Sequence, residues 1–172
     1  MKEFALTPIL ALSAWFYFFP SQPEAAFDPS RQPPQAEPPA TAEQVVRRGD
    51  EIMTNHGSLS QSAHQDLLQV RELCNHFVMI HSRLAPEAIP DNVSLTRLLV
   101  RGGPGITALL TPGHHCLGTD LKGRLALCDR WSVPYCIHFT PSRKASVISA
   151  GPDRIFGNDD DLSARDDFLA SL

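Results

Sequence analysis

The clearest hydrophobic pattern in the chain predicts an amphipathic helix that begins after Ser62 and ends before Pro86. Ser62 and Gln65 have the spacing of a capping box, in which each side chain accepts a hydrogen bond from the other residue's backbone amide. Apolar residues then recur at steps of three and four, which places them on one face of a helix: Leu67, Val70, Leu73, Cys74, Phe77, Ile80 and Leu84. This face is expected to contribute to a core.

Two shorter helices are predicted on either side of this one. Thr41 can cap a helix that extends to about Asn55, with an apolar stripe formed by Val45, Val46, Ile52 and Met53. Asp91 or Asn92 can cap another helix, whose apolar residues are Leu95, Leu98 and Leu99. The sequence Gly-Gly-Pro at 102–104 stops that helix.

The pattern changes from helical to strand-like after residue 114. Residues 115–117 and 125–128 predict the arms of a hairpin, joined by a turn-like stretch at 118–123. Residues 135–140 alternate between apolar and polar positions, and a turn at 141–144 leads into a further strand at 145–149. An order of helices followed by strands is typical of the α+β class. We therefore predict N-terminal helices packed on a small antiparallel β-sheet.

The first 40 residues differ in composition from the rest of the chain. Residues 4–19 are mostly apolar but shorter than the roughly 20 residues of an ordinary membrane span, so they predict a signal or a short anchor. Seven prolines then occur between Pro20 and Pro39, and proline lacks the amide donor that helices and sheets need. We therefore divide the chain into a hydrophobic signal or membrane anchor (1–19), a Pro-rich linker (20–40) and a globular domain (41–172).

Charge and motif content narrow the class of function. The formal net charge is −4 and the sequence has no basic stripe, which argues against nucleic-acid binding. The sequence also lacks GxSxG, HExxH, P-loop and dinucleotide-binding fingerprints, so we predict a non-enzymatic protein. Four cysteines suit disulfides in an exported domain, or else four buried thiols, and sequence alone does not choose a pairing: Cys74, Cys116, Cys128 and Cys136.

The segment from Ser149 to Leu162 is acidic and contains glycines that permit tight turns. Hard cations such as calcium bind six to eight oxygens from carboxylates and backbone carbonyls, and Asp153, Asp160 and Asp161 could supply the charged ones. Carbonyls near Ala150 and Ile155 could complete such a shell. The spacing is not that of an EF-hand, and a solvated acidic turn is the alternative interpretation.

Two motifs make residues 116–162 resemble the globular domain of the major pseudopilins of bacterial type II secretion. The segment 129–135 resembles the family signature D-P/R-W-G-x-P-Y through Asp129, Trp131, Pro134 and Tyr135. The segment 149–153, which contains Gly151, resembles S-x-G-A/P-D, and residues 160–162 resemble the closing D-D-I. The motifs follow in the family's order and are separated by two strands of the expected length.

The resemblance implies a calcium-binding final loop, with Asp153, Asp161 and Asp160 as ligands and Asp159 as a weaker candidate. It implies an extracytoplasmic domain of the cell envelope that contacts other envelope or secretion-system proteins or copies of itself, with the N-terminal segment in the membrane. Two features depart from the family. Ser132 stands where the family usually has glycine, and residues 2–4 do not supply the prepilin signature. A tethered binding module that is not assembled into a pseudopilus is therefore the alternative function.

Overall fold

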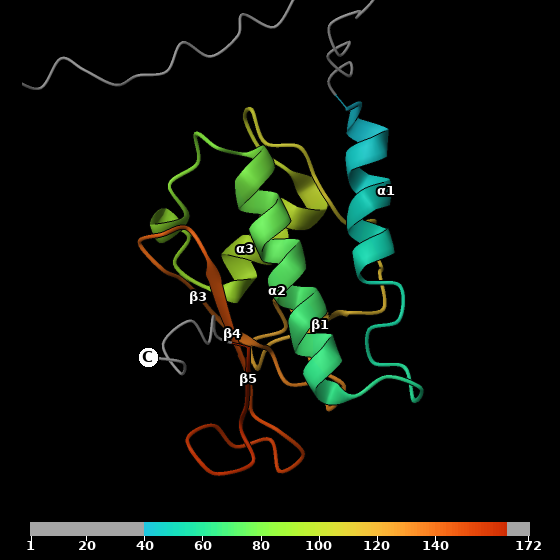
Figure 1. Ribbon diagram of the computed structural model, residues 1–172, viewed down its shortest axis with the longest axis vertical. Coiled ribbons are helices and arrows are strands. Elements are labelled where there is room, and N and C mark those ends of the chain that lie inside the picture. Colours follow the sequence, from blue (N-terminus) through green and yellow to red (C-terminus); the bar gives the residue numbers. More distant parts are fainter. Residues whose placement is uncertain (1–39, 165–172) are drawn as a thin grey trace, which may run out of the picture. The chain divides into compact units, whose positions relative to one another are not determined.

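The computed structural model describes residues 40–164, which form helices followed by strands (Figure 1). The helices are α1 (Ala42–Ile52), α2 (Ala63–Ile80), the short 3₁₀ helix η1 (Pro86–Ala88) and α3 (Asn92–Arg101). The strands are β1 (Leu117–Thr119), β2 (Leu125–Leu127), β3 (Cys136–Phe139), β4 (Ala145–Ser149) and β5 (Leu162–Ala164). This order confirms the predicted α+β class. The predicted anchor at 1–19 and nearly all of the predicted linker lie outside the described residues.

Local capping sets the starts of all three α-helices, as the sequence predicted. The Thr41 hydroxyl accepts a hydrogen bond from the Gln44 amide at 3.3 Å, and the Gln44 side chain accepts one from the Thr41 amide at 2.7 Å. Ser62 and Gln65 form the same reciprocal pair at the start of α2. Asp91 caps α3 by accepting a hydrogen bond from the amide three residues later. These side chains satisfy amides that have no partner inside the helix.

Within residues 40–164, no helix has the length and apolar composition needed to cross a membrane.

The core lies between α2 and a three-stranded sheet. Figure 1 shows α2 lying along the strands β3, β4 and β5, and its contacts are with β4 and β5. Val147 and Ala164 of these strands are buried. Five residues of the predicted apolar face of α2 are buried, whereas Ile80 is half-buried: Leu67, Val70, Leu73, Cys74 and Phe77. Asp66 and Val78, which the helical spacing did not select, are buried as well. Burying a large apolar side chain stabilises the fold by roughly 1.5–3 kcal/mol, so this face contributes much of the domain's stabilisation.

The strands form two antiparallel sheets, where the sequence predicted one. One sheet pairs β1 with β2, and the other has the order β3-β4-β5. The two sheets are separated by the turn that starts at Asp129, and an isolated bridge between Cys128 and Pro134 closes that turn. The strand β5 was not predicted, because three residues are too few for an alternating pattern to be recognised. It pairs with β4 through Ser149 opposite Leu162.

The side chain of Asn92 joins α3 to the point where the two sheets meet. Its amide nitrogen donates to the carbonyls of Leu127 and Tyr135, each at 2.8 Å. Its oxygen accepts hydrogen bonds from the Leu127 amide at 3.0 Å and from the Thr96 hydroxyl at 2.9 Å. Asn92 is 8% exposed. All four hydrogen-bonding positions of the carboxamide are therefore used inside the protein.

A buried histidine contacts Tyr135, which belongs to the segment 129–135 (the signature segment). His56 is 5% exposed, and its Nε2 lies 2.9 Å from the Tyr135 hydroxyl. Burial lowers the pKa of His56 to about 4, and the nearby Asp66 carboxylate opposes this by raising it. The remaining neighbours that lower this pKa are His115, His114 and Arg130. Burial also raises the pKa of Tyr135, so the pair is uncharged at neutral pH.

We expect Asn92→Ala to lower the free energy of unfolding by about 3 kcal/mol, because three buried hydrogen bonds to the backbone of Leu127 and Tyr135 are lost. Urea denaturation of the wild-type and variant proteins measures this difference. The matched control is Asn55→Ala, which removes the same side chain at an exposed position and should change stability by less than about 0.5 kcal/mol. Equal effects of the two substitutions would contradict the role assigned to Asn92.

We expect the free energy of unfolding to fall as pH falls from about 6.5 to about 4. In this range the unfolded His56 binds a proton and the folded His56 does not, so acid favours the unfolded state. The full loss from this one group is roughly 3 kcal/mol. His56→Gln should reduce the pH dependence measured by urea denaturation, whereas His64→Gln, at an exposed position, should leave it unchanged. An unchanged slope in His56→Gln would show that other groups carry the acid sensitivity.

Candidate functional site

Asp129 organises the signature segment into a tight turn. Its Oδ1 accepts hydrogen bonds from the Trp131 amide at 3.0 Å and the Val133 amide at 2.8 Å. The backbone closes the same turn, since the Asp129 amide donates to the Val133 carbonyl at 2.9 Å. Asp129 is 6% exposed, so its charge is compensated by these donors rather than by water. An aspartate that accepts hydrogen bonds from amides ahead of it is a common way to start a turn.

Ser132 lies at the point of this turn where the backbone takes a left-handed conformation, with φ of 64°. Residues with a Cβ atom are uncommon in this region, whereas glycine enters it readily. This conformation explains why the resembling family usually has glycine at the position. Ser132 therefore adopts a left-handed backbone conformation in spite of its Cβ atom.

A buried hydrogen-bond chain joins the two motifs that the sequence singled out. The Ser149 hydroxyl donates to Asp129 Oδ2 at 2.6 Å, and the Gly151 amide donates to Ser149 Oγ at 3.2 Å. Ser149 is 1% exposed. The sequence placed these residues in separate motifs 20 positions apart, and the fold brings them into direct contact. Asp129 thereby fixes both the signature turn and the start of the acidic loop.

Gly151 allows the two ends of the acidic loop to approach closely. Its φ is 69°, and a Cβ atom there would lie 2.3 Å from the Asp160 carbonyl oxygen and 2.7 Å from Asp160 Oδ2. A Cβ atom cannot lie that close to a non-bonded backbone oxygen. Glycine is therefore required at this position by both conformation and space.

The aspartates of the loop hold it together by accepting hydrogen bonds from the loop itself. Asp153 accepts bonds from the Ile155 amide at 2.8 Å and the Asn158 side chain at 2.7 Å. Asp160 Oδ2 accepts a bond from the Asp153 amide at 3.2 Å, and Asp161 Oδ2 accepts one from the Gly157 amide at 2.7 Å. The three candidate ligands thus belong to one local network, as expected for residues of one turn.

One oxygen of this network has no partner. Asp161 Oδ1 is buried and makes no hydrogen bond. A buried carboxylate oxygen without a donor is energetically costly, so this atom is the part of the loop best suited to a cation. Among residues 40–164, no group of three or more His, Cys, Asp or Glu side chains is arranged to hold a metal ion. Asp159 is exposed.

An ion pair that the sequence did not predict fixes the signature segment to α2. Arg130 donates to Asp66 Oδ2 through Nε at 2.9 Å and Nη2 at 2.7 Å. Asp66 is 1% exposed, and its other oxygen accepts hydrogen bonds from Gly57 and Gln61. Asp66 also lies in the first turn of α2, where the helix dipole favours a negative charge. No local sequence pattern indicates this pairing, because the two residues are 64 positions apart.

Two cavities of similar volume are among those on the described surface. The first, of about 670 Å³, is lined by residues 119–122 of the hairpin, residues 131–134, Arg154 and Phe156. Trp131 is half-buried and lines this cavity, whereas Tyr135 is buried in the core. The sequence analysis did not predict the cavity, because its walls come from three separate loops.

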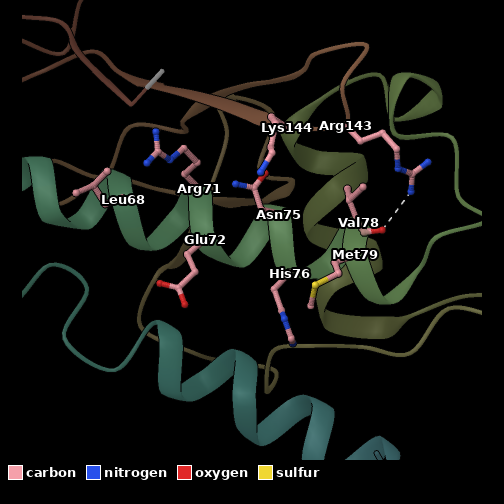
Figure 2. Close-up of a pocket in the computed structure, with 9 residues that line it drawn as sticks. All are labelled: Leu68, Arg71, Glu72, Asn75, His76, Val78, Met79, Arg143 and Lys144. Carbon is pink, nitrogen blue, oxygen red and sulfur yellow. Dashed lines mark hydrogen bonds between the residues drawn. The ribbon is translucent and has the colours of Figure 1, made fainter. Parts of the chain in front are cut away.

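The second cavity is a groove of about 680 Å³ beside α2, shown in Figure 2. One wall is α2, and the other is the β3–β4 turn with Arg143 and Lys144. The Arg143 guanidinium donates to the carbonyls of Val78 at 3.1 Å and Leu84 at 2.9 Å, which ties the turn to the end of α2. The α2 residues that line the groove are Leu68, Arg71, Glu72, Asn75, His76, Val78 and Met79. The groove has charges of both signs, so it does not indicate one class of ligand.

The four cysteines are all free thiols in the structure. Cys74, Cys116 and Cys128 are buried, and Cys136 is half-buried. Burial raises the pKa of Cys74 and Cys116 to about 12 and that of Cys128 to about 11, so these thiols stay protonated at neutral pH. These three buried thiols therefore lack the lowered pKa of a catalytic nucleophile.

The chain was compared with known proteins at three levels. No family model, no curated protein and no solved structure matches it.

Proposed function

We propose that residues 41–172 form a non-enzymatic, pseudopilin-like structural or interaction domain of the bacterial cell envelope, associated with type II secretion. The observation that carries the proposal is the buried contact of Asp129 with Ser149. It unites the two segments on which the family resemblance rests, in an α+β domain whose helices precede its strands. In this proposal the segment 1–19 tethers the chain to the membrane, and the globular domain lies outside the cytoplasm.

The proposed role of the domain is to present surfaces to other proteins. The partners are other envelope or secretion-system proteins or further copies of the chain. The half-buried Trp131 and the exposed Phe156 line one cavity, and aromatic residues are enriched at protein–protein contacts. In the described residues, the buried cysteines have raised pKa values, which does not favour a thiol enzyme.

We also propose that the acidic loop binds calcium. The ligands are Asp161, whose Oδ1 lacks a donor, together with Asp153 and Asp160 from the same network. Backbone carbonyls of the loop supply further oxygens, as calcium requires. The ion would take the place of hydrogen bonds that Asn158 and the loop amides donate to these carboxylates. Its role would be to stabilise the loop.

A second candidate function is a tethered binding module that uses the same domain without assembling into a pseudopilus. The capping box at Thr41 favours it, because it starts α1 at the end of the Pro-rich segment. A helix that begins at its own cap is not a continuation of an upstream helix. The chain would then stand off the membrane on residues 20–40.

We expect calcium to raise the free energy of unfolding by about 2.7 kcal/mol at 100 times its dissociation constant. Thermal unfolding of the full chain in calcium and in chelator measures this. Asp161→Asn and Asp153→Asn should lose the calcium-dependent rise, whereas Asp159→Asn removes the same charge and should keep it. A wild-type protein that responds to neither calcium nor chelator would refute the metal site but not the fold resemblance.

We expect the full chain to form filaments when detergent is removed, because the first candidate function requires subunits to associate. Negative-stain electron microscopy and analytical ultracentrifugation measure the product. Phe16→Asp with Phe18→Asp, in the apolar segment, should abolish assembly, while Ser30→Asp in the linker should not. Monomers that stay bound to membranes through the N-terminal segment would favour the tethered binding module instead.

A further inference from the structure

Cys116 and Cys128 stand directly opposite each other at the open end of the β1–β2 hairpin. The register pairs Leu117 with Leu127, and the next pair outward is Cys116 with Cys128. The Cys128 amide donates to the Cys116 carbonyl at 2.9 Å, which continues the ladder to this pair. Opposite residues of an antiparallel pair have Cα atoms about 4.5–5.5 Å apart. A disulfide needs Cα atoms about 4.4–6.8 Å apart, so the ordinary spacing of an antiparallel pair lies within its range.

The two thiols are also on the same face of the hairpin, which faces the interior. Cys116 is 1% exposed and Cys128 is 5% exposed. The Cys128 sulfur lies over β1, since a Cβ atom built at Gly118 would be 2.7 Å from it. Residues 116 and 118 share one face of a strand, so the absence of a side chain at Gly118 leaves the Cys128 sulfur free to lie there.

We propose that Cys116 and Cys128 form a disulfide that closes the hairpin when the protein is in an oxidising compartment. The other two cysteines have no comparable partner. Cys136 lies opposite Ile148 in the sheet, and Cys74 is completely buried on α2. The pairing follows from the hairpin register and does not depend on the proposed secretion role.

The bond would form by thiol–disulfide exchange with a small disulfide. His114 Nδ1 lies 3.1 Å from Cys116 Sγ, and burial lowers the pKa of His114, so this imidazole is neutral at pH 7. A small disulfide such as oxidised glutathione first forms a mixed disulfide with Cys128 and releases one thiol. The Cys116 thiol then loses its proton to solvent, its thiolate attacks the Cys128 sulfur, and the displaced thiolate takes up a proton and leaves as a second thiol. One small disulfide is thereby reduced to two thiols while two cysteines are oxidised to one bond.

The bond would fix the start of the signature turn. Cys128 directly precedes Asp129, and the bridge between Cys128 and Pro134 closes the turn. A crosslink at Cys128 therefore restrains the backbone from which Asp129 reaches Ser149. Cys136 is a useful contrast, because its Sγ lies 3.1 Å from His138 Nε2 and is more accessible. Reactivity alone would select Cys136, whereas the register selects Cys116 and Cys128.

The test equilibrates the folded full chain with reduced and oxidised glutathione, then traps free thiols by alkylation and maps peptides by mass spectrometry. We expect one intramolecular disulfide joining Cys116 to Cys128, with Cys74 and Cys136 alkylated after unfolding. The oxidised protein should melt about 5–10 °C above the reduced protein, as expected for a crosslink that closes a short loop. Peptide mapping of the wild type does not depend on whether any variant folds.

Matched variants separate register from reactivity. Cys136→Ser should keep the disulfide, and Cys116→Ser should abolish it and leave Cys128 as a free thiol or a glutathione adduct. His114→Gln should leave the position of the disulfide unchanged. A bond that involves Cys74 or Cys136, or the persistence of four free thiols in excess oxidised glutathione, would overturn the proposal. None of these results bears on calcium binding or filament formation.

Discussion

The packing of this domain depends on satisfying the backbone groups where its two small sheets meet. A three-residue strand such as β2 has few partners of its own, and β2 ends against the turn that leads to β3. From the first turn of α3, Asn92 makes hydrogen bonds to the backbone groups of Leu127 and to the Tyr135 carbonyl. A buried carbonyl or amide without a partner costs roughly 1–3 kcal/mol. Displacing α3 would therefore lower the free energy of unfolding by removing hydrogen bonds at this junction. One carboxamide thus couples a helix to both sheets.

The candidate site lies next to that junction, and residues of the segment 129–135 connect it to other elements of the fold. Asp129 turns the chain after β2 and also holds Ser149 at the end of β4. Arg130, the next residue, pairs with Asp66 on α2. The signature segment is therefore fixed on one side by the sheet and on the other by the longest helix. This arrangement explains why polar residues of the signature segment are buried: their side chains make hydrogen bonds and ion pairs that connect separate elements.

What could be predicted from sequence was what is local in the chain. The capping boxes at Thr41 and Ser62 span three residues, and the helical spacing after Ser62 repeats over several turns, so both are visible as patterns. The contacts that connect separate elements are not local. The Asn92 contact with Leu127 spans 35 positions, and the Arg130 contact with Asp66 spans 64. No periodicity marks such pairs. The sequence singled out the segments 129–135 and 149–153, but the contact between them through Asp129 and Ser149 is visible only in the fold.

The acidic loop is coupled to the core through its ends rather than through its own packing. Ser149 and Leu162 pair across β4 and β5, so the loop between them is closed at its base. Ser149 is also the residue that bonds to Asp129. Opening the loop at its base would therefore break β5 away from β4 and expose the face that α2 covers. The loop itself has exposed apolar side chains at Ile155 and Phe156, so its local stability rests on the aspartate network. Any ligand that strengthens that network acts on the stability of the whole domain, because the loop and the core share Ser149.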